Sequence, residues 1–490
     1  MTSTFHGLEL GKRALFAQQT ALSTTGHNIA NANTTGYTRQ RVDMQATNPI
    51  SIAGTSSFQL GTGVDVNKIE RLREDYLDLQ MRGENKNLGY WEAKSDTLSK
   101  VEEVLNEPSD NGLAHVMDEF WAGWEELAKN PDNASARSVV RQKGVAVAET
   151  FNYLSNSLDA IQSDLKLVIE AKTSSVNSLA TQISNLNDQI SRLVPNNYEP
   201  NDLYDQRDVL IDQLSKLVDV KVSQADNGMV NISVSDEMLV SGKTASQLNV
   251  EIKKDNDGNE YVSAVTIKSP TNPAKEIQLQ SGELAGRIES FGTATGGIIP
   301  DMKKKVDLLA QTFAEKINQV HSSGLRISNN NGTITMVPAT GINFFNGSNA
   351  KNLVVNPDIM NSLDMIAAAA KEANGSSSIG NGGNAQAIAN IKFDGSLDFN
   401  GTTSTSDDFY RNIIGQLGID SLESQRMKSN SEVIVQQVDN RRLSVSGVSL
   451  DEEMANMIKY QQAYNAAARM VTAMDQCLDK VINGMGRVGL

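Results

Sequence analysis

Cysteine is almost missing from this chain of 490 residues, in which Cys477 stands alone. One cysteine excludes a disulfide within the chain, which suits a cytosolic protein or one that is exported unfolded. Cys477 has no base beside it in the sequence and lies near an apolar seam. We therefore expect it to be a small buried hydrophobic residue rather than a nucleophile.

Histidine is scarce as well, and the four histidines show no metal-ligand spacing. The run Asp255–Gly258 is only partly similar to a calcium loop, because the downstream glutamate ligand is missing, and a hairpin turn is favoured. Residues 325–405 contain neither a His-Glu zinc motif nor a Gly-Xaa-Ser-Xaa-Gly elbow. The sequence thus predicts no catalytic residue, no metal and no cofactor, and the chain is not expected to be an enzyme.

An excess of positive charge and long apolar runs are also lacking. The formal net charge is −15, and no Lys/Arg cluster offsets it, so we expect neither a nucleic acid nor an anionic membrane as partner. No run of about eighteen apolar residues occurs, and the segment Met1–Ala17 has no apolar core. We expect no membrane span and no cleavable signal peptide.

What the sequence does contain is a long striped segment, Gly447–Leu490, which we predict to be helical. Its apolar residues recur at steps of four, three and seven, as in a coiled-coil seam. Ser449 and Glu452 have capping-box spacing and mark the start of the helix. The seam consists of Leu450, Met454, Met457, Tyr464, Ala468, Val471, Leu478, Ile482 and Met485.

A second one-sided helix is predicted before residue 31. Its larger apolar residues recur every seven positions and are Leu8, Leu15, Leu22 and Ile29. Glycines within it each weaken the helix by up to ~1 kcal/mol, so it should be marginal alone. It ends in the polar run Asn31–Tyr37, where Gly36 indicates a turn. We expect the two terminal helices to pair.

Between these helices the pattern predicts a discontinuous, multidomain α+β protein. Residues 1–45 with 447–490 form the terminal assembly domain, with paired coiled-coil helices; 46–218, 283–324 and 406–446 form a long-helix bundle. A very long bundle helix is expected after Pro131, with an apolar seam of Val147, Phe151, Leu154, Leu158, Ile161, Leu165 and Val168 that resumes with Val176, Leu179, Ile183, Leu186, Ile190 and Leu193. Residues 219–282 alternate as strands around the Asn227-Gly228 turn and predict an inserted β-rich domain. The second insertion, 325–405, is rich in Asn, Gly and Ser, and within it we expect a short helix at Ala367–Ala370.

Both chain ends carry recognisable runs. Residues 21–31 and 35–40 resemble the N-terminal signature of the bacterial flagellar axial proteins, the family of rod, hook and hook-associated subunits. Runs at 446–453 and 460–464 look like the other end of that family. Interior runs at 126–131, 202–208 and 437–442 are similar to its hook-associated protein 1 group. The signature positions are Asn28, Ile29, Ala30, Asn31, Gly36 and Tyr37.

The resemblance implies a structural subunit of the junction between flagellar hook and filament. Such subunits are secreted unfolded through the flagellar type III export channel, with an uncleaved N-terminal signal and a chaperone on the C-terminal region. The implied partners are further copies in a ring, the hook protein on one side and the next hook-associated junction protein on the other. The implied location is the extracellular flagellum.

Assembly through the terminal helices is the mechanism that the residues themselves favour. Two weak striped helices can pair within a subunit and contact neighbours head to tail, and such contacts propagate. The predicted assembly interface is Leu8, Leu15, Leu22, Ile29, Leu450, Met454, Met457, Tyr464, Ala468, Val471, Leu478 and Ile482. Three alternatives remain: an ordinary intramolecular helix pair, another axial subunit of hook or rod type, or an adhesin or antigen role of the insertions.

Overall fold

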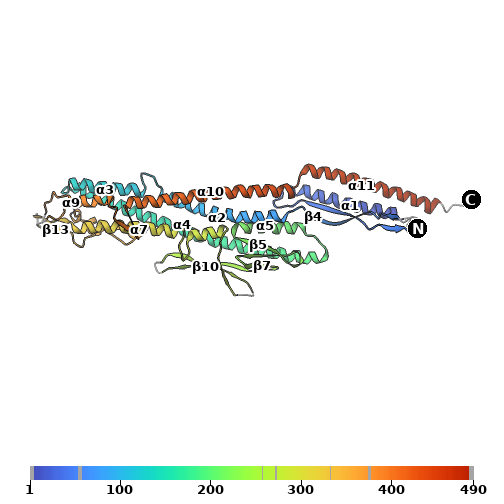
Figure 1. The fold of residues 1–490 in the computed structure, drawn as a ribbon, viewed down its shortest axis with the longest axis horizontal. Helices are drawn as coiled ribbons and strands as arrows, with labels where there is room; N and C mark the ends of the chain where they lie inside the picture. Colours follow the sequence, from blue (N-terminus) through green and yellow to red (C-terminus); the bar gives the residue numbers. More distant parts are fainter. Residues whose placement is uncertain are drawn as a thin grey trace, which may run out of the picture.

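The computed structural model describes residues 5–52, 58–255, 258–270, 273–330, 333–372 and 377–484. The molecule is elongated, with the terminal helices at one end and a helical bundle along the rest of its length (Figure 1). Two small sheets lie against one side of the bundle. The predicted multidomain α+β architecture with paired terminal helices is confirmed.

The long helices account for most of the fold. They are α1 (His6–Ala30), α2 (Asp75–Leu105), α3 (Leu113–Lys129), α4 (Ala134–Leu193), α5 (Asn201–Leu217), α6 (Glu283–Phe291), α7 (Ile298–Ser323), α10 (Ser406–Ser446) and α11 (Leu450–Asp479). The short helices α8 (Pro357–Asn361) and α9 (Gly383–Ala389) lie within the segment 325–405. A five-residue π-turn, Lys480–Gly484, follows α11.

The strands form short antiparallel pairs and two small sheets. Near the N-terminus β1 (Gln40–Ala46) pairs with β4 (Val64–Arg71), and β2 (Ile50–Ile52) pairs with β3 (Phe58–Leu60). The first sheet contains β5 (Val220–Gln224), β6 (Val230–Val234), β7 (Glu237–Ser241) and β8 (Thr244–Ala245). The second contains β9 (Gln247–Lys254), β10 (Glu260–Lys268) and β11 (Lys275–Ile277).

Helix α4 is the axis of the bundle, and its 60 residues span roughly 90 Å. It starts where Asn133 caps it, accepting a hydrogen bond from the Ser135 N–H at 2.8 Å. Most of its predicted apolar seam is buried, from Val147 and Phe151 to Ile183 and Ile190, whereas Leu193 at its end is exposed. The helix therefore forms because one continuous apolar face is covered along most of its length.

Asparagines on α4 attach the two sheets. The side chain of Asn177 donates to Leu248 O at 2.9 Å and accepts from Leu248 N at 2.7 Å. Asn187 donates to Val230 O and Gly242 O, both at 2.8 Å. The predicted hairpin around Asn227-Gly228 is present as β5–β6. Polar contacts thus fix the β-rich insertion on a helix whose apolar seam the sequence showed.

The segment 325–405 shares its core with the bundle. Phe344 and Phe345 are buried, and both rings pack edge-on or tilted against Phe120. Phe345 also contacts Phe313, and Trp124 contacts Phe344. Its strands are β12 (Leu325–Asn330), β13 (Thr333–Pro338), β14 (Phe345–Asn346), β15 (Val354–Val355), β16 (Leu397–Phe399) and β17 (Thr402–Ser404). The predicted helix at Ala367–Ala370 is wrong. These alanines are extended, and Ala369 bonds to Leu325.

His321, at the end of α7, is completely buried beside this aromatic core. Its Nδ1 bonds to Ile342 O at 2.9 Å, and its Nε2 accepts from the Ala367 N–H at 3.0 Å. This arrangement requires the neutral imidazole with its proton on Nδ1. Burial lowers the pKa of His321 to about 4; the bond to Ile342 opposes the shift and Arg137 adds to it.

Acid should therefore destabilise this end of the molecule. The folded-state pKa lies below the ordinary value of 6.5, so the unfolded chain binds more protons between these values. The full stability is present above pH 6.5, and about 3 kcal/mol should be lost as the pH falls towards 4. Urea denaturation at several pH values measures this slope.

The variant His321→Asn should unfold more easily at pH 7 but lose less stability between pH 6.5 and 4. His115→Asn is the matched control, because the His115 side chain is exposed. An identical pH slope in the wild type and in His321→Asn would contradict the assignment.

Candidate functional site

Helices α1 and α11 pack against each other in antiparallel fashion (Figure 1). A Cβ at Gly7 would lie 2.7 Å from the Met474 side chain, and one at Gly11 would lie 2.7 Å from Val471. At the opposite end of the pair, Asn28 contacts Glu453. The glycines that weaken α1 as an isolated helix thus allow α11 to approach closely.

The predicted leucine stripe flanks this contact. Leu8, Leu15, Leu22 and Ile29 are each half-buried. Leu8 follows Gly7 by one residue, so its side chain points about 100° away around the helix axis. Ala17 and Ala21 are more deeply buried than these four residues. On the α1 side the closest approach to α11 is made at the small residues Gly7 and Gly11, which a search for large apolar residues overlooks.

On α11 the predicted seam divides into two groups. Five members are half-buried: Met457, Tyr464, Ala468, Val471 and Leu478. Three others are exposed: Leu450 at 48%, Met454 at 51% and Ile482 at 65%. Met485 lies outside the described residues. Cys477 is exposed, so its predicted burial is wrong.

Asn28 lies in the last turn of α1, where it is buried and contacts the loop that follows the helix. Its amide donates to Gln40 O at 2.9 Å and to Glu453 Oε2 at 3.1 Å. Its carbonyl accepts from Gln40 N at 3.0 Å and from the Tyr37 hydroxyl at 2.8 Å. Burial and nearby carboxylates raise the pKa of Tyr37, so the hydroxyl stays protonated and can donate. Two signature residues therefore fold the loop back onto α1 and α11.

The other signature positions have smaller parts. Asn31 closes α1, since its N–H and its side-chain amide both donate to His27 O. Ile29 is half-buried and Ala30 is exposed. Gly36 has a φ of +79°, and a Cβ there would lie 2.0 Å from the Val209 side chain. Gly36 is thus required both for the turn and for close approach to α5.

Glu453 is the buried charge that joins the two chain ends, with only 2% of its surface exposed. Arg39 Nε donates to it at 2.8 Å, and Arg39 Nη1 donates to Glu452 at 2.7 Å. Burial alone would lower the pKa of Arg39, but the two glutamates outweigh it and raise the pKa. Arg39 N also donates to Ser446 O at 2.9 Å, at the end of α10.

Only one of the two hydrogen bonds of the predicted capping box forms at the start of α11. The Ser449 hydroxyl accepts from Glu452 N at 3.5 Å, as expected. The Glu452 carboxylate, however, is bound to Arg39.

A network of arginines and aspartates connects this loop to the bundle. Arg71 Nη1 donates to Asp205 at 2.8 Å and to Asp208 at 2.9 Å. Burial would raise the pKa of Asp208, but Arg73, Arg71 and Arg82 hold it below its usual value. The network as a whole consists of Arg71, Arg73, Arg82 and Arg442 with Asp78, Asp205, Asp208 and Asp212. It ties the end of β4 to α2, α5 and α10.

Sequence reasoning missed this network as a site. Asp205, Asp208 and Asp212 are spaced three and four residues apart, so they lie on one face of α5. That spacing was the available signal. The chain contains many acidic residues, however, and the arginine partners come from segments far away in the sequence.

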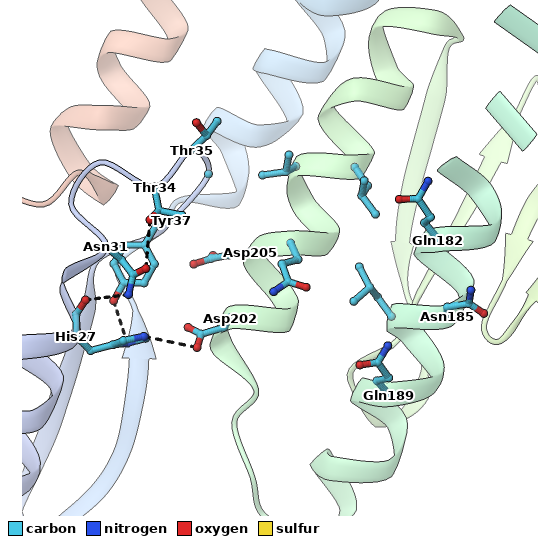
Figure 2. Close-up of a pocket in the computed structure, with 15 residues that line it drawn as sticks. His27, Asn31, Thr34, Thr35, Tyr37, Gln182, Asn185, Gln189, Asp202 and Asp205 are labelled. Atoms are coloured by element: carbon cyan, nitrogen blue, oxygen red, sulfur yellow. Dashed lines mark hydrogen bonds and ion pairs between the residues drawn. The ribbon is translucent and has the colours of Figure 1, made fainter. Parts of the chain in front are cut away.

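A cleft lies beside the loop, with a volume of about 640 Å³. Figure 2 shows His27, Tyr37 and Asp202 on one side and Gln182, Asn185 and Gln189 of α4 on the other. A second hollow of about 720 Å³ shares Gly36, Gln182 and Val209 with it, so the two form one groove along α4 and α5. The groove is lined by amide, hydroxyl and charged side chains around the apolar residues Leu179, Leu186, Val209 and Leu210, a composition suited to contact with another protein surface.

Two findings limit the kinds of site that this region can be. Among the described residues, no three His, Cys, Asp or Glu side chains are grouped so that they could hold a metal ion. Within the same part of the chain, no helix is long and apolar enough to cross a membrane. The arrangement is one of buried ion pairs that hold helices together.

Three family models match the chain. Residues 98–345 match the helical domain of flagellar hook-associated protein FlgK. Residues 440–484 match the C-terminal model of the flagellar basal body rod FlgEFG proteins, and residues 8–38 match the flagella basal body rod protein. The terminal matches coincide with the paired ends of the molecule, and the central match covers much of the bundle.

Individual relatives agree with these models. Flagellar hook-associated protein 1 of Bacillus subtilis is 41% identical over 99% of both chains. That of Escherichia coli is 26% identical and covers 96% of this chain and 98% of its own. The solved flagellar hook junction protein FlgK from Burkholderia pseudomallei has a similar fold, with a TM-score of 0.60 at 14% identity, over 74% of this chain and all of that one.

Removing the buried carboxylate should loosen the helix pair. In Glu453→Ala, Arg39 and Asn28 lose their buried partner, and undocking of α11 should become easier by about 3 kcal/mol. Hydrogen exchange of the amides in α1 and α11 measures this change. Glu452→Ala is the matched control, since the Glu452 side chain binds the same arginine but is 62% exposed; it should cost less than about 1 kcal/mol. Equal effects of the two variants would refute the special role of Glu453.

Gly36→Ala should destabilise the loop by about 1–3 kcal/mol, because the new methyl group meets Val209 and the backbone must keep a positive φ. The midpoint of thermal unfolding reports the loss. Gly26→Ala is the control, because a Cβ there meets nothing within 4 Å and the helix gains up to ~1 kcal/mol. A neutral Gly36→Ala would show that the close packing on α5 is unimportant.

Proposed function

The chain belongs to the flagellar hook-associated protein 1 family, and from that premise we propose that it joins the flagellar hook to the filament and self-assembles through its terminal helices after export. Membership itself makes the chain a structural protein of the flagellar axis, and not an enzyme. The junction position, the assembly route and the named partners below are the proposal.

The observation that carries the assembly proposal is how little of α11 is covered. Of its thirty residues, only Glu453 and Ala467 are buried, and its closest approach to α1 is at the two glycines Gly7 and Gly11. So little burial hardly offsets the entropy of ordering two helices, roughly 1–2 kcal/mol per residue. A pair of this kind becomes stable when neighbouring subunits cover its remaining surface.

Uncovered apolar side chains are available for such neighbours. The stripe of Leu8, Leu15, Leu22 and Ile29 is only half-buried, and Leu450 and Met454 are largely exposed. Contacts between unlike surfaces of identical subunits propagate around a ring or along a helix. We propose that copies of the chain form such a ring, with the hook protein on one side and the next hook-associated junction protein on the other.

Export before assembly fits the same features. We propose that the chain leaves the cell unfolded through the flagellar export channel, guided by an uncleaved N-terminal signal. An export chaperone on the C-terminal region would cover α11, whose exposed apolar residues otherwise favour premature contact. The absence of internal disulfides leaves nothing covalent to break before passage.

The insertions also support a structural role over an adhesin role. Residues 325–405 place Phe344, Phe345 and Ile366 in the same core as α3, α4 and α7. The β-rich segment is fixed to α4 by Asn177 and Asn187. Segments that complete the bundle stiffen the subunit.

Cells that lack the gene for this protein should make hooks without filaments and release filament subunits into the medium. Electron microscopy of the cells and a gel of the culture supernatant measure the two outcomes. Normal filaments on such cells would overturn the junction proposal.

A gene that lacks the codons for residues 449–490 should produce the same appearance. The purified truncated chain should still show the bundle's own melting transition, because the bundle core lies outside α11. A bundle that no longer folds after truncation would contradict an assembly role confined to the terminal pair.

A further inference from the structure

The groove beside the signature loop is an interface that the α1–α11 pair leaves open. Its α4 wall carries Ser175, Ser178, Gln182, Asn185 and Gln189, and its floor is Leu179, Leu186, Val209 and Leu210. From Ser175 to Gln189 it extends roughly 21 Å along the helix. An apolar floor between hydrogen-bonding walls is the shape that receives a helix with an apolar edge.

A row of exposed apolar side chains, short enough to fit within the length of the groove, lies at the start of α11; we call it the ridge. Leu450, Met454 and Ile458 are four residues apart and therefore lie in one row, and they are 48%, 51% and 61% exposed. The row is roughly 12 Å long, so it is shorter than the groove. Farther along α11, α1 packs on the face that carries Val471 and Met474, which by helix geometry lies about 100° or more around the helix from this row.

The ridge and the groove lie at the same height along the molecule. Gly36 borders the groove, and Arg39, three residues later, binds Glu453 inside the first turn of α11. Figure 1 shows α11 leaving the bundle on one edge and the end of α4 on the opposite edge at this level. The ridge of one subunit therefore faces outward where a lateral neighbour would present its groove.

The charges at the outer ends of the two surfaces are opposite. The outer end of the ridge carries Lys459, and the outer end of the groove carries Asp202. At the bundle end of the groove the cations Lys172 and Arg442 are paired with Glu283 and Asp212, which line the same hollow. Two subunits side by side in the same orientation can thus bring Lys459 of one towards Asp202 of the other.

We propose that the occupant of the groove is a second copy of this chain, with the ridge Leu450–Met454–Ile458 of one subunit seated in the groove of its neighbour. Lys459 lies six residues, roughly 9 Å, beyond Glu453. Asp202 lies near the level of Glu453, because Gln40 donates to Asp202 and Asn28 donates both to Gln40 O and to Glu453. An axial step of about 9 Å between neighbours brings Lys459 opposite Asp202 and Ile458 beside Gln189. The contact is heterologous, because ridge and groove are different surfaces, so it can continue from subunit to subunit. It rests on the proposed assembly and adds the surfaces that meet.

The test is cross-linking in flagella isolated from cells. The full-length chain carries Cys477→Ser, which removes the exposed native thiol, together with Ile458→Cys and Gln189→Cys. Treatment with a short bifunctional maleimide should convert at least half of the monomer into a ladder of dimers and higher multimers on a denaturing gel. Either cysteine alone should leave a monomer.

The matched control replaces Gln189→Cys by Tyr153→Cys. Tyr153 is also exposed on α4, but it lies 36 residues away, roughly 54 Å along the helix. The control pair should give no ladder. Monomer alone with the Ile458 and Gln189 pair, or equal ladders with both pairs, overturns the contact while assembly stands. If the protein with its native sequence is not found between hook and filament, the proposed function itself fails and the contact with it.

Discussion

The carboxylate of Glu453 is the constraint on which the arrangement of the chain ends depends. It is buried between Arg39 and Asn28, and a buried charge must be paired where it lies. Satisfying it requires three segments to meet: the end of α1, the loop that follows, and the first turn of α11. Because the same arginine holds Ser446 O, the end of α10 is fixed as well. One ion pair thus sets the angle at which the terminal helices leave the bundle.

The arginine–aspartate network extends that constraint into the bundle. Asp205 accepts from Thr38 N at 2.8 Å and from Arg71, while Arg442 on α10 reaches Asp212 at 2.6 Å. Buried ion pairs are weak evidence for stability, because desolvation offsets much of their attraction. They do impose direction, since each carboxylate accepts donors only from certain angles. The network therefore specifies one geometry among the many ways in which apolar helices can pack.

The spacing of apolar residues along the chain predicted much of the fold, but it did not predict much of the site. The seam of α4 and the hairpin at Asn227-Gly228 were visible because burial and turn chemistry act over neighbouring residues. Family likeness pointed to Asn28 and Tyr37, but their partner Glu453 is some 425 residues from Asn28, and no local pattern joins them. The alanines at 367–370 show the opposite failure: their helix propensity was overridden by pairing with Leu325 and burial in a shared core.

The length of α4 has a mechanical consequence. The helix continues for 60 residues without a proline, past the sheets and the aromatic core, to the level of the signature loop. Tension or twist applied at the terminal helices is passed to α4 through α5 and the ion pairs. Along α4 the helix is then unbroken as far as its start at Ala134. A rotating shaft built from such subunits is stiff along each subunit. Such a shaft is expected to bend where ion pairs between segments, and not one continuous helix, transmit the force.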